Sequence, residues 1–249
     1  MNSNLPSPPM KSDNAKNIVL LLAGGYGLRM QSIRPKQFIE TEGESILLHT
    51  MKAFERHPLV DEVWVVCNPE WSSYVAGQAA IGHIRKFRQT IPSGKTSHHS
   101  LINGIRGLEA AGTASDCIVL VHESVRPFVS HEIISNNILT CSKYGNAVTA
   151  LYSHESYLCT EDGKSSDGFL SREKLMRAQT PITFRLSDLL AIVQNAIELG
   201  VDESQSLFTL VNEIGWKPLH IVEGNMLNYK ITLPLDVEIY NRLRNINYD

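Results

Sequence analysis

Short apolar runs alternate with helical patterns along the first half of the chain. Residues 17–23 are apolar after the first position and stop at a glycine cluster, which is typical of a strand buried on both faces. Leu47, Met51 and Phe54 then follow at helical spacing. The same alternation predicts further strands at 63–67, 87–91, 117–121 and 147–152, and helices at 71–81, 97–111 and 131–143.

Strands that alternate with helices build βαβ units with parallel strands and right-handed crossovers. We therefore predict an α/β fold, a Rossmann-like and mostly parallel sheet flanked by helices. Residues 153–174 interrupt this pattern, since they are polar and contain Asp162-Gly163 and Asp167-Gly168, both strong turn signals. This segment predicts a projecting β-arm.

The last third of the chain returns to helical patterns. A strand is expected at 217–222, and a final helix begins near Pro234, which suits a first helical turn. We expect the final helix to bury an apolar face made of Leu235, Ile239, Leu243 and Ile246. Residues 1–16 are rich in Asn, Ser and Pro and predict a flexible tail, which leaves 17–249 as a single domain.

Composition narrows the classes of partner. The net charge is −3, so no overall positive field attracts a nucleic acid, and a site for anions must gather its charge locally. No apolar run approaches the roughly 20 residues that span a bilayer, so we expect no membrane association. The four cysteines are widely spaced, which favours reduced thiols and a cytoplasmic protein.

The densest chemical signal lies directly after the first strand. Gly24, Gly25 and Gly27 let backbone N–H groups approach an anion, because no Cβ blocks them. Arg29 and Lys36 add two positive charges within a short stretch. The spacing matches neither the Walker loop nor the dinucleotide-binding glycine pattern. We predict a triphosphate site here; the alternative is a glycine turn beside two solvated basic side chains.

Six ordered blocks of the chain resemble the cytidylyltransferases that act on methylerythritol phosphate and ribitol phosphate. The first reads L-A-G-G-x-G-x-R-M-x4-P-K-Q-F, and a later one reads V-H-E-S-V-R-P-F at 121–128. The others lie at 49–54, 100–104, 172 with 178–184, and 223–232. The resemblance implies CTP and a small alcohol phosphate as substrates, Mg²⁺ as cofactor, and a homodimer that exchanges its arms.

The resemblance also implies a reaction that needs no dedicated base. The acceptor's phosphate attacks the α-phosphorus of CTP and pyrophosphate leaves; a phosphate monoester is already largely ionised near neutral pH, since its second pKa is about 6. Catalysis therefore rests on cations that position and screen the two anions. The residues implied are Arg29, Lys36 and Lys230 for catalysis; Ala23, Gly24, Gly25, Gly27, Gly94, Ser100 and Glu123 for the nucleotide; Arg126, Thr232 and a partner subunit's Arg172 for the acceptor; and Glu123 for the metal.

Departures from the family pattern gather on the acceptor side. Glu155-Ser156 stands where an Asp-Thr pair is usual, and Ile182 replaces a glutamine. Residues 201–204 read V-D-E-S where T-D-[DE]-A is usual. Nearer the nucleotide, Lys95 stands where Asp or Ala is common, and Glu123 stands where the family usually has Asp. We therefore expect a polyol phosphate other than methylerythritol phosphate. The alternatives are the methylerythritol phosphate enzyme of isoprenoid synthesis, a UTP-dependent sugar-1-phosphate nucleotidyltransferase, and a non-catalytic nucleotide-binding relative.

Three histidines near these blocks are expected to be structural. His122 follows an apolar strand, and we predict that it packs or makes a structural hydrogen bond rather than binding a ligand. His98 and His99 are adjacent, so on a helix they face different directions and do not form a metal pair. We expect them at the surface or at a helix start.

Overall fold

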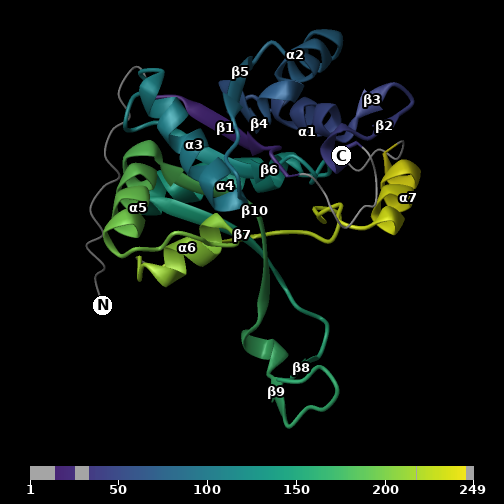
Figure 1. Ribbon diagram of the computed structural model, residues 1–249, viewed down its shortest axis with the longest axis vertical. Coiled ribbons are helices and arrows are strands. Elements are labelled where there is room, and N and C mark those ends of the chain that lie inside the picture. The colour runs from purple at the N-terminus through teal and green to yellow at the C-terminus, as the bar shows by residue number, and fades with distance from the viewer. Residues whose placement is uncertain (1–14, 26–33, 217, 245–249) are drawn as a thin grey trace.

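A seven-stranded sheet forms the centre of the molecule in the computed structural model, which describes residues 15–25, 34–216 and 218–244 (Figure 1). Its strands are β1 (Asn17–Leu22), β4 (Glu62–Cys67), β5 (Phe87–Pro92), β6 (Ile118–Glu123), β7 (Asn146–Tyr152), β10 (Met176–Arg185) and β11 (Ile221–Glu223). They lie in the order β11-β7-β10-β6-β1-β4-β5. Only β10 runs antiparallel to its neighbours among these strands, so the mostly parallel sheet is confirmed.

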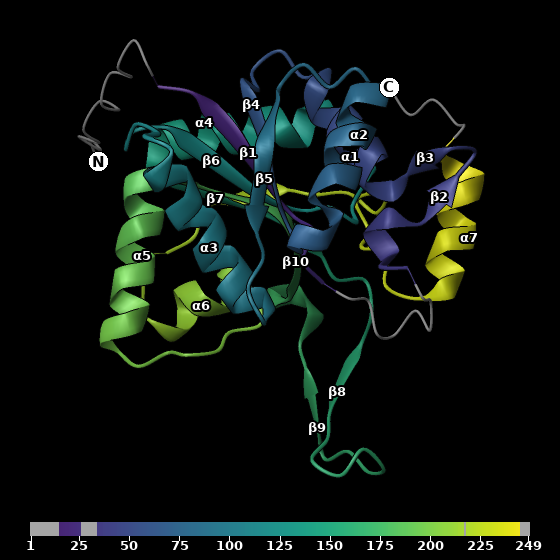
Figure 2. The same cartoon turned by 45° about the horizontal axis from the view of Figure 1, so that its top comes forward.

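Helices cover both faces of this sheet (Figure 2). They are α1 (Ile46–Glu55), α2 (Ser72–Ile81), α3 (Ser97–Ala110), α4 (His131–Tyr144), α5 (Leu186–Glu198) and α6 (Leu207–Glu213). One further helix, α7 (Pro234–Leu243), packs on a separate small cluster. Val19 and Leu21 of β1 pack with α1, α2 and α4, whereas Ile18 and Leu20 pack with α3, α5 and α6. Because successive side chains of a strand point to opposite faces, a strand between two helical layers must be apolar throughout.

Short elements complete the chain and form the arm. They are the 3-10 helices η2 (Lys36–Phe38), η3 (Pro69–Trp71) and η4 (Arg172–Lys174), the pair β2 (Glu40–Thr41) and β3 (Glu44–Ser45), and the pair β8 (Tyr157–Cys159) and β9 (Gly168–Leu170). The β8–β9 pair lies beyond the ends of β7 and β10 and projects from the body (Figures 1 and 2). A projecting β-arm within 153–174 is what the sequence predicts.

Strand β10 was not predicted. Its sequence contains Pro181, which cannot donate to a ladder and therefore argues against a central strand. The structure accommodates the proline at a register shift against β7, between Ala178 and Ile182. The strand passes between β6 and β7 and so carries Thr180 to the end of β6.

The expected inward face of α7 is wrong. Leu235 and Ile239 are 62% and 40% exposed, whereas Tyr240 is completely buried. The helix does not pack on the main sheet; it packs on a small cluster with Ile46, Val125 and Ile231. The ring of Tyr240 fills the space between these three side chains, so α7 buries Tyr240 and leaves Leu235 exposed. Ile246 lies outside the described residues.

None of the helices in the described ranges is both long and apolar enough to cross a membrane.

Candidate functional site

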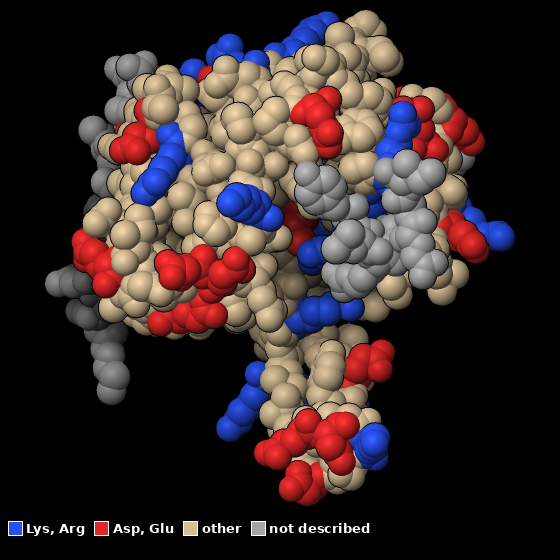
Figure 3. All heavy atoms as spheres, in the orientation of Figure 1, with Lys and Arg blue, Asp and Glu red and all other residues tan. Residues whose placement is uncertain are grey.

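A cavity of about 540 Å³ opens at the carboxyl ends of β1 and β6. Its walls include the loop after β1, the loop between β5 and α3, the residue pair Thr180 and Ile182 of β10, and the segment from Lys230 to Thr232. In Figure 3 a hollow lies above the root of the arm, and acidic and basic atoms are both visible in it. Open α/β sheets bind ligands at this edge, and the cavity has the size of a small-molecule site.

The loop after β1 is held close to the neighbouring loops. Gln37 donates from Nε2 to the carbonyl oxygens of Ala23 and Gly25, at 2.6 and 2.8 Å. A Cβ added to Gly24 would lie 2.6 Å from Cβ of Ser93, so only glycine fits at this position. Ala23, Gly24 and Gly25 all line the cavity, as the sequence predicts. Gly27 and Arg29 lie outside the described residues.

The loop before α3 brings Gly94 and Ser100 to the cavity wall. Ser100 Oγ accepts a hydrogen bond from the Gly94 N–H at 3.1 Å and donates to the Thr96 carbonyl at 2.8 Å. A Cβ on Gly94 would lie 2.3 Å from Cβ of His99. These contacts show that Ser100 shapes the loop and that Gly94 cannot be larger.

Glu123, the last residue of β6, bridges two cations. Its Oε2 accepts from Arg126 Nε at 2.7 Å, and its Oε1 forms an ion pair with Lys230 Nζ. Its backbone N–H donates to Thr180 Oγ1 at 3.1 Å, so β10 helps to place it. Burial disfavours the ionised carboxyl, but the charges of Arg126 and Lys230 outweigh it and lower the pKa of Glu123 to about 2.

Two further contacts connect the cations to the segment from Asn228 to Thr232. Arg126 Nη1 donates to the Asn228 carbonyl at 2.7 Å, and Lys36 Nζ donates to the Ile231 carbonyl at 2.8 Å. Lys36, Lys230, Glu123 and Thr232 line the cavity. The side chain of Arg126 is buried and does not line the cavity wall. Arg126 is joined to the site by its ion pair with Glu123.

Arg172 stands apart from the other predicted residues. It lies in η4, in the arm, and does not line the cavity of its own chain. Within one chain, Arg126 and Lys230 pair with Glu123, and Lys36 lines the same cavity and binds the Ile231 carbonyl. Arg172 lies on the projecting arm, in η4.

His122 makes structural contacts, which confirms the prediction. It is fully buried, its Nε2 lies 3.1 Å from the Arg126 carbonyl, and its Nδ1 lies 3.0 Å from Thr180 Oγ1. Burial lowers the pKa of His122 to about 4, so the ring is neutral at pH 7.

His98 was expected at the surface or at a helix start. It lies at the start of α3, but its side chain is buried and lines the cavity. No group of three or more His, Cys, Asp or Glu side chains in the described ranges could hold a metal by itself.

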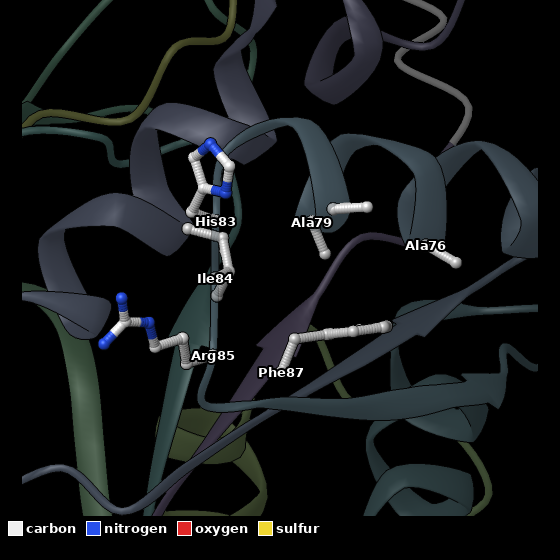
Figure 4. A pocket seen from close by; sticks show the side chains of 7 residues that line it. Ala76, Ala79, His83, Ile84, Arg85 and Phe87 are labelled. Carbon is white, nitrogen blue, oxygen red and sulfur yellow. The ribbon is translucent and has the colours of Figure 1, made fainter.

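A second hollow, of about 300 Å³, lies between the end of α2 and the start of β5 (Figure 4). Its lining residues include Ala76, Ala79, Ile84 and Phe87, together with His83 and Arg85. It has no carboxylate and no glycine loop among its lining residues. The chemistry therefore belongs to the larger cavity.

Sequence reasoning missed the residues that hold the site together. Gln37, Thr180 and Asn228 all stand inside the blocks that resemble the cytidylyltransferases, and block membership was the available signal. Their contacts are to backbone groups, namely the carbonyl oxygens of Ala23 and Thr180 and the N–H of Glu123. Contacts of that kind leave no pattern in the spacing of side chains.

Comparison with known proteins places the site in a family. The family model described as 2-C-methyl-D-erythritol 4-phosphate cytidylyltransferase matches residues 17–242. A ribitol-5-phosphate cytidylyltransferase from Streptococcus agalactiae serotype Ia is 33% identical over 228 residues, 91% of this chain and 95% of that protein. A 2-C-methyl-D-erythritol 4-phosphate cytidylyltransferase from Clostridium acetobutylicum is 29% identical over 222 residues, 89% of this chain and 94% of that one.

A solved structure gives the same result for the fold. The crystal structure of a 4-diphosphocytidyl-2C-methyl-D-erythritol synthase superposes with a TM-score of 0.76 at 26% identity and covers 94% of this chain and all of that one. The match of the family model, the identity to these relatives and the cation-lined cavity agree with one another. This chain belongs to the 2-C-methyl-D-erythritol 4-phosphate cytidylyltransferase family and is a nucleotidyltransferase.

Proposed function

We propose that this enzyme transfers the cytidylyl group of CTP to the phosphate of ribitol 5-phosphate, giving a CDP-alcohol and pyrophosphate. The observation that carries the proposal is the pairing of Glu123 with Arg126 and Lys230, with Lys36 on the wall of the same cavity, beside a glycine loop at the carboxyl ends of β1 and β6. The choice of acceptor is supported by the relatives from Streptococcus agalactiae, which are named for ribitol 5-phosphate.

The reaction is one displacement at phosphorus. An oxygen of the acceptor's phosphate forms a bond to the α-phosphorus of CTP while the bond from that phosphorus to the bridging oxygen of the β-phosphate breaks. That oxygen leaves with pyrophosphate, and no proton has to be removed from the attacking group, because its second pKa is about 6. The barrier is the repulsion between two anions, so fixed cations lower it.

Each predicted residue has a role in this scheme. Lys36 and Lys230, with Arg29, hold the triphosphate and stabilise charge at the α-phosphate. Thr232 and Arg172 of the partner subunit hold the acceptor's phosphate, and Arg126, which pairs with Glu123 behind the cavity wall, adds its positive charge to their attraction for that phosphate. The base, ribose and phosphates of CTP lie against the loop residues Ala23, Gly24, Gly25, Gly27, Gly94 and Ser100, with Glu123 beside them. Backbone N–H groups of such loops are good donors to anions.

Mg²⁺ fits this set of donors. Mg²⁺ keeps several waters and binds proteins through one or two carboxylates together with substrate phosphates. Glu123 is the carboxylate among the lining residues, and each of its oxygens has a second lone pair beyond the one used by Arg126 or Lys230. Glu123 would hold the ion through water, and the ion would supply charge neutralisation on the triphosphate.

A homodimer completes the site in this proposal. Leu158 and Phe169 on the arm are 73% and 76% exposed, and Tyr157 and Leu170 beside them are exposed as well. Apolar side chains gathered on a projecting hairpin are typical of an interface. The arm would lie on a second copy and bring Arg172 to that copy's cavity.

We place the enzyme in the cytoplasm. Its four cysteines are free, and three of them, Cys67, Cys117 and Cys141, are buried. Free buried thiols suit a reducing compartment.

Pyrophosphate release tests the proposal. We expect turnover with CTP and ribitol 5-phosphate, and values of kcat/KM at least about tenfold lower with methylerythritol 4-phosphate or glycerol 3-phosphate. UTP in place of CTP should give little turnover. A preference for methylerythritol 4-phosphate would contradict the choice of acceptor, a preference for UTP with a sugar 1-phosphate would contradict the reaction class, and no turnover with any pair would indicate a non-catalytic relative.

A further inference from the structure

One short segment, residues 228–232, brings together three cations of the site. The carbonyl oxygen of Asn228 accepts from Arg126, and the carbonyl oxygen of Ile231 accepts from Lys36. The third cation, Lys230, belongs to the segment itself and pairs with Glu123. The backbone of 228–232 therefore sets the spacing between three charges that come from three distant parts of the chain.

The start and middle of this segment are tied to the sheet. Asn228 Nδ2 donates to the Thr180 carbonyl at 2.8 Å and to Gln179 Oε1 at 3.2 Å. The Ile231 N–H donates to the Val125 carbonyl at 3.0 Å, and the Ile231 side chain is completely buried. These contacts use residues that adjoin the site itself.

The end of the segment depends on one residue outside the cavity. Asp236 Oδ2 accepts from the N–H groups of Thr232 and Leu233, both at 2.7 Å. The backbone carbonyl of Asp236 also accepts from Tyr229 Oη at 3.2 Å. Asp236 thus contacts residues that precede and follow Lys230 in the sequence, although it does not itself line the cavity. Hydrogen bonds to an ionised carboxylate are stronger than those between neutral groups, and a carboxylate in the first turn of α7 also suits the helix dipole.

We propose that Asp236 is a positioning residue for cytidylyl transfer: it fixes the backbone around Lys230 and so keeps Lys230, Thr232 and the carbonyl that holds Lys36 in place. The inference rests on the proposed function, because it assigns Asp236 a part in that reaction. In a reaction that depends on positioned charge, a displacement of about 1 Å can cost on the order of 100-fold in rate. An ordinary helix cap affects stability alone.

The test compares two cap removals. Asp236→Ala is matched by Ser130→Ala, which removes the side chain that accepts from the Ile133 N–H at the start of α4. No residue of α4 lines the cavity. Both variants should lower the thermal midpoint by a few degrees, about the effect of a lost cap. Assayed well below both midpoints, only Asp236→Ala should lose kcat, by about 10- to 100-fold, with a smaller change in KM for CTP.

Two milder variants keep the test decisive should Asp236→Ala not fold. Asp236→Asn retains an oxygen acceptor and should recover most of the lost kcat. Tyr229→Phe removes only the hydroxyl that donates to the backbone carbonyl of Asp236, the second tie between α7 and the segment, and should lower kcat by about two- to fivefold. Values of kcat within twofold of the Ser130→Ala protein for all the Asp236 and Tyr229 variants that fold would overturn the proposal.

Hydrogen exchange separates this inference from the proposed function. The amides of Thr232 and Leu233 donate to Asp236, so they should exchange at least about tenfold faster in Asp236→Ala and at the wild-type rate in Ser130→Ala. Unchanged exchange at these amides would refute the anchoring itself. If exchange accelerates but the wild-type protein forms no CDP-alcohol from any acceptor, the proposed function fails while the anchor stands.

Discussion

At the scale of single residues, the pKa of His49 makes the stability of the fold depend on pH. His49 lies on α1, its Nδ1 is 3.1 Å from Tyr240 Oη on α7, and its ring packs against Phe128. Burial, and then the charge of Arg244, lower the pKa of His49 to about 4. The folded protein therefore binds this proton more weakly than the unfolded chain, whose histidines titrate near 6.5. The contribution of neutral, buried His49 to the free energy of unfolding is complete above about pH 6.5 and is lost as the pH falls toward 4.

We accordingly predict that the free energy of unfolding decreases between pH 6.5 and 4, with roughly 3 kcal/mol of the decrease due to His49. Urea unfolding at a series of pH values measures it. His49→Gln should make the profile shallower in this window without abolishing it, because buried His122, whose pKa also lies at about 4, contributes there too. His154→Gln, at an exposed position in the arm, should leave the profile as in the wild type. The carboxylate of Glu123 does not interfere, because its pKa of about 2 lies below the window. Parallel profiles for wild type and His49→Gln would contradict the assignment.

At the scale of elements, the parts that sequence could predict are those with a single periodicity. Strand β1 was predictable because a strand between two helical layers is apolar at every position. Strand β10 was not, since Pro181 argues against a central strand and only the register shift against β7 admits it. Helix α7 was found, but with the wrong face, because its one buried contact is Tyr240 in a small cluster rather than a row of leucines.

The site divides in the same way. The meeting of Lys36, Lys230 and Glu123 at one cavity was predictable because motif blocks surround all three. Gln37 and Asp236 were not predicted as functional, since both act on backbone N–H or carbonyl groups. Which backbone group a side chain meets is decided by tertiary packing, and no pattern of residue types records it.

At the scale of the whole molecule, the arm separates Arg172 from the cavity of its own chain. The β8–β9 hairpin extends away from the sheet (Figure 2). Its apolar side chains, among them Leu158 and Phe169, are exposed. An arm exchanged between two copies would combine the body of one subunit with Arg172 of the partner subunit. Each of the two sites would then depend on both chains.

Mixing two inactive proteins tests the exchange. Lys230→Ala disables the body of a subunit and Arg172→Ala disables its arm. In a mixed dimer, one site combines an intact body with an intact arm, so unfolding, mixing and refolding the two variants should recover about a quarter of the wild-type activity. Each variant treated alone is the control. If Arg172 served its own chain, the mixture would stay inactive.

The most direct test of the account follows the α-phosphate of CTP. With CTP labelled at that position and ribitol 5-phosphate as acceptor, the label should appear in a CDP-alcohol in equal amounts with unlabelled pyrophosphate, and Lys230→Ala should reduce the rate by about 100-fold or more. Label left in CTP while the protein binds the nucleotide, or label released as CMP without the alcohol, would contradict cytidylyl transfer at this site.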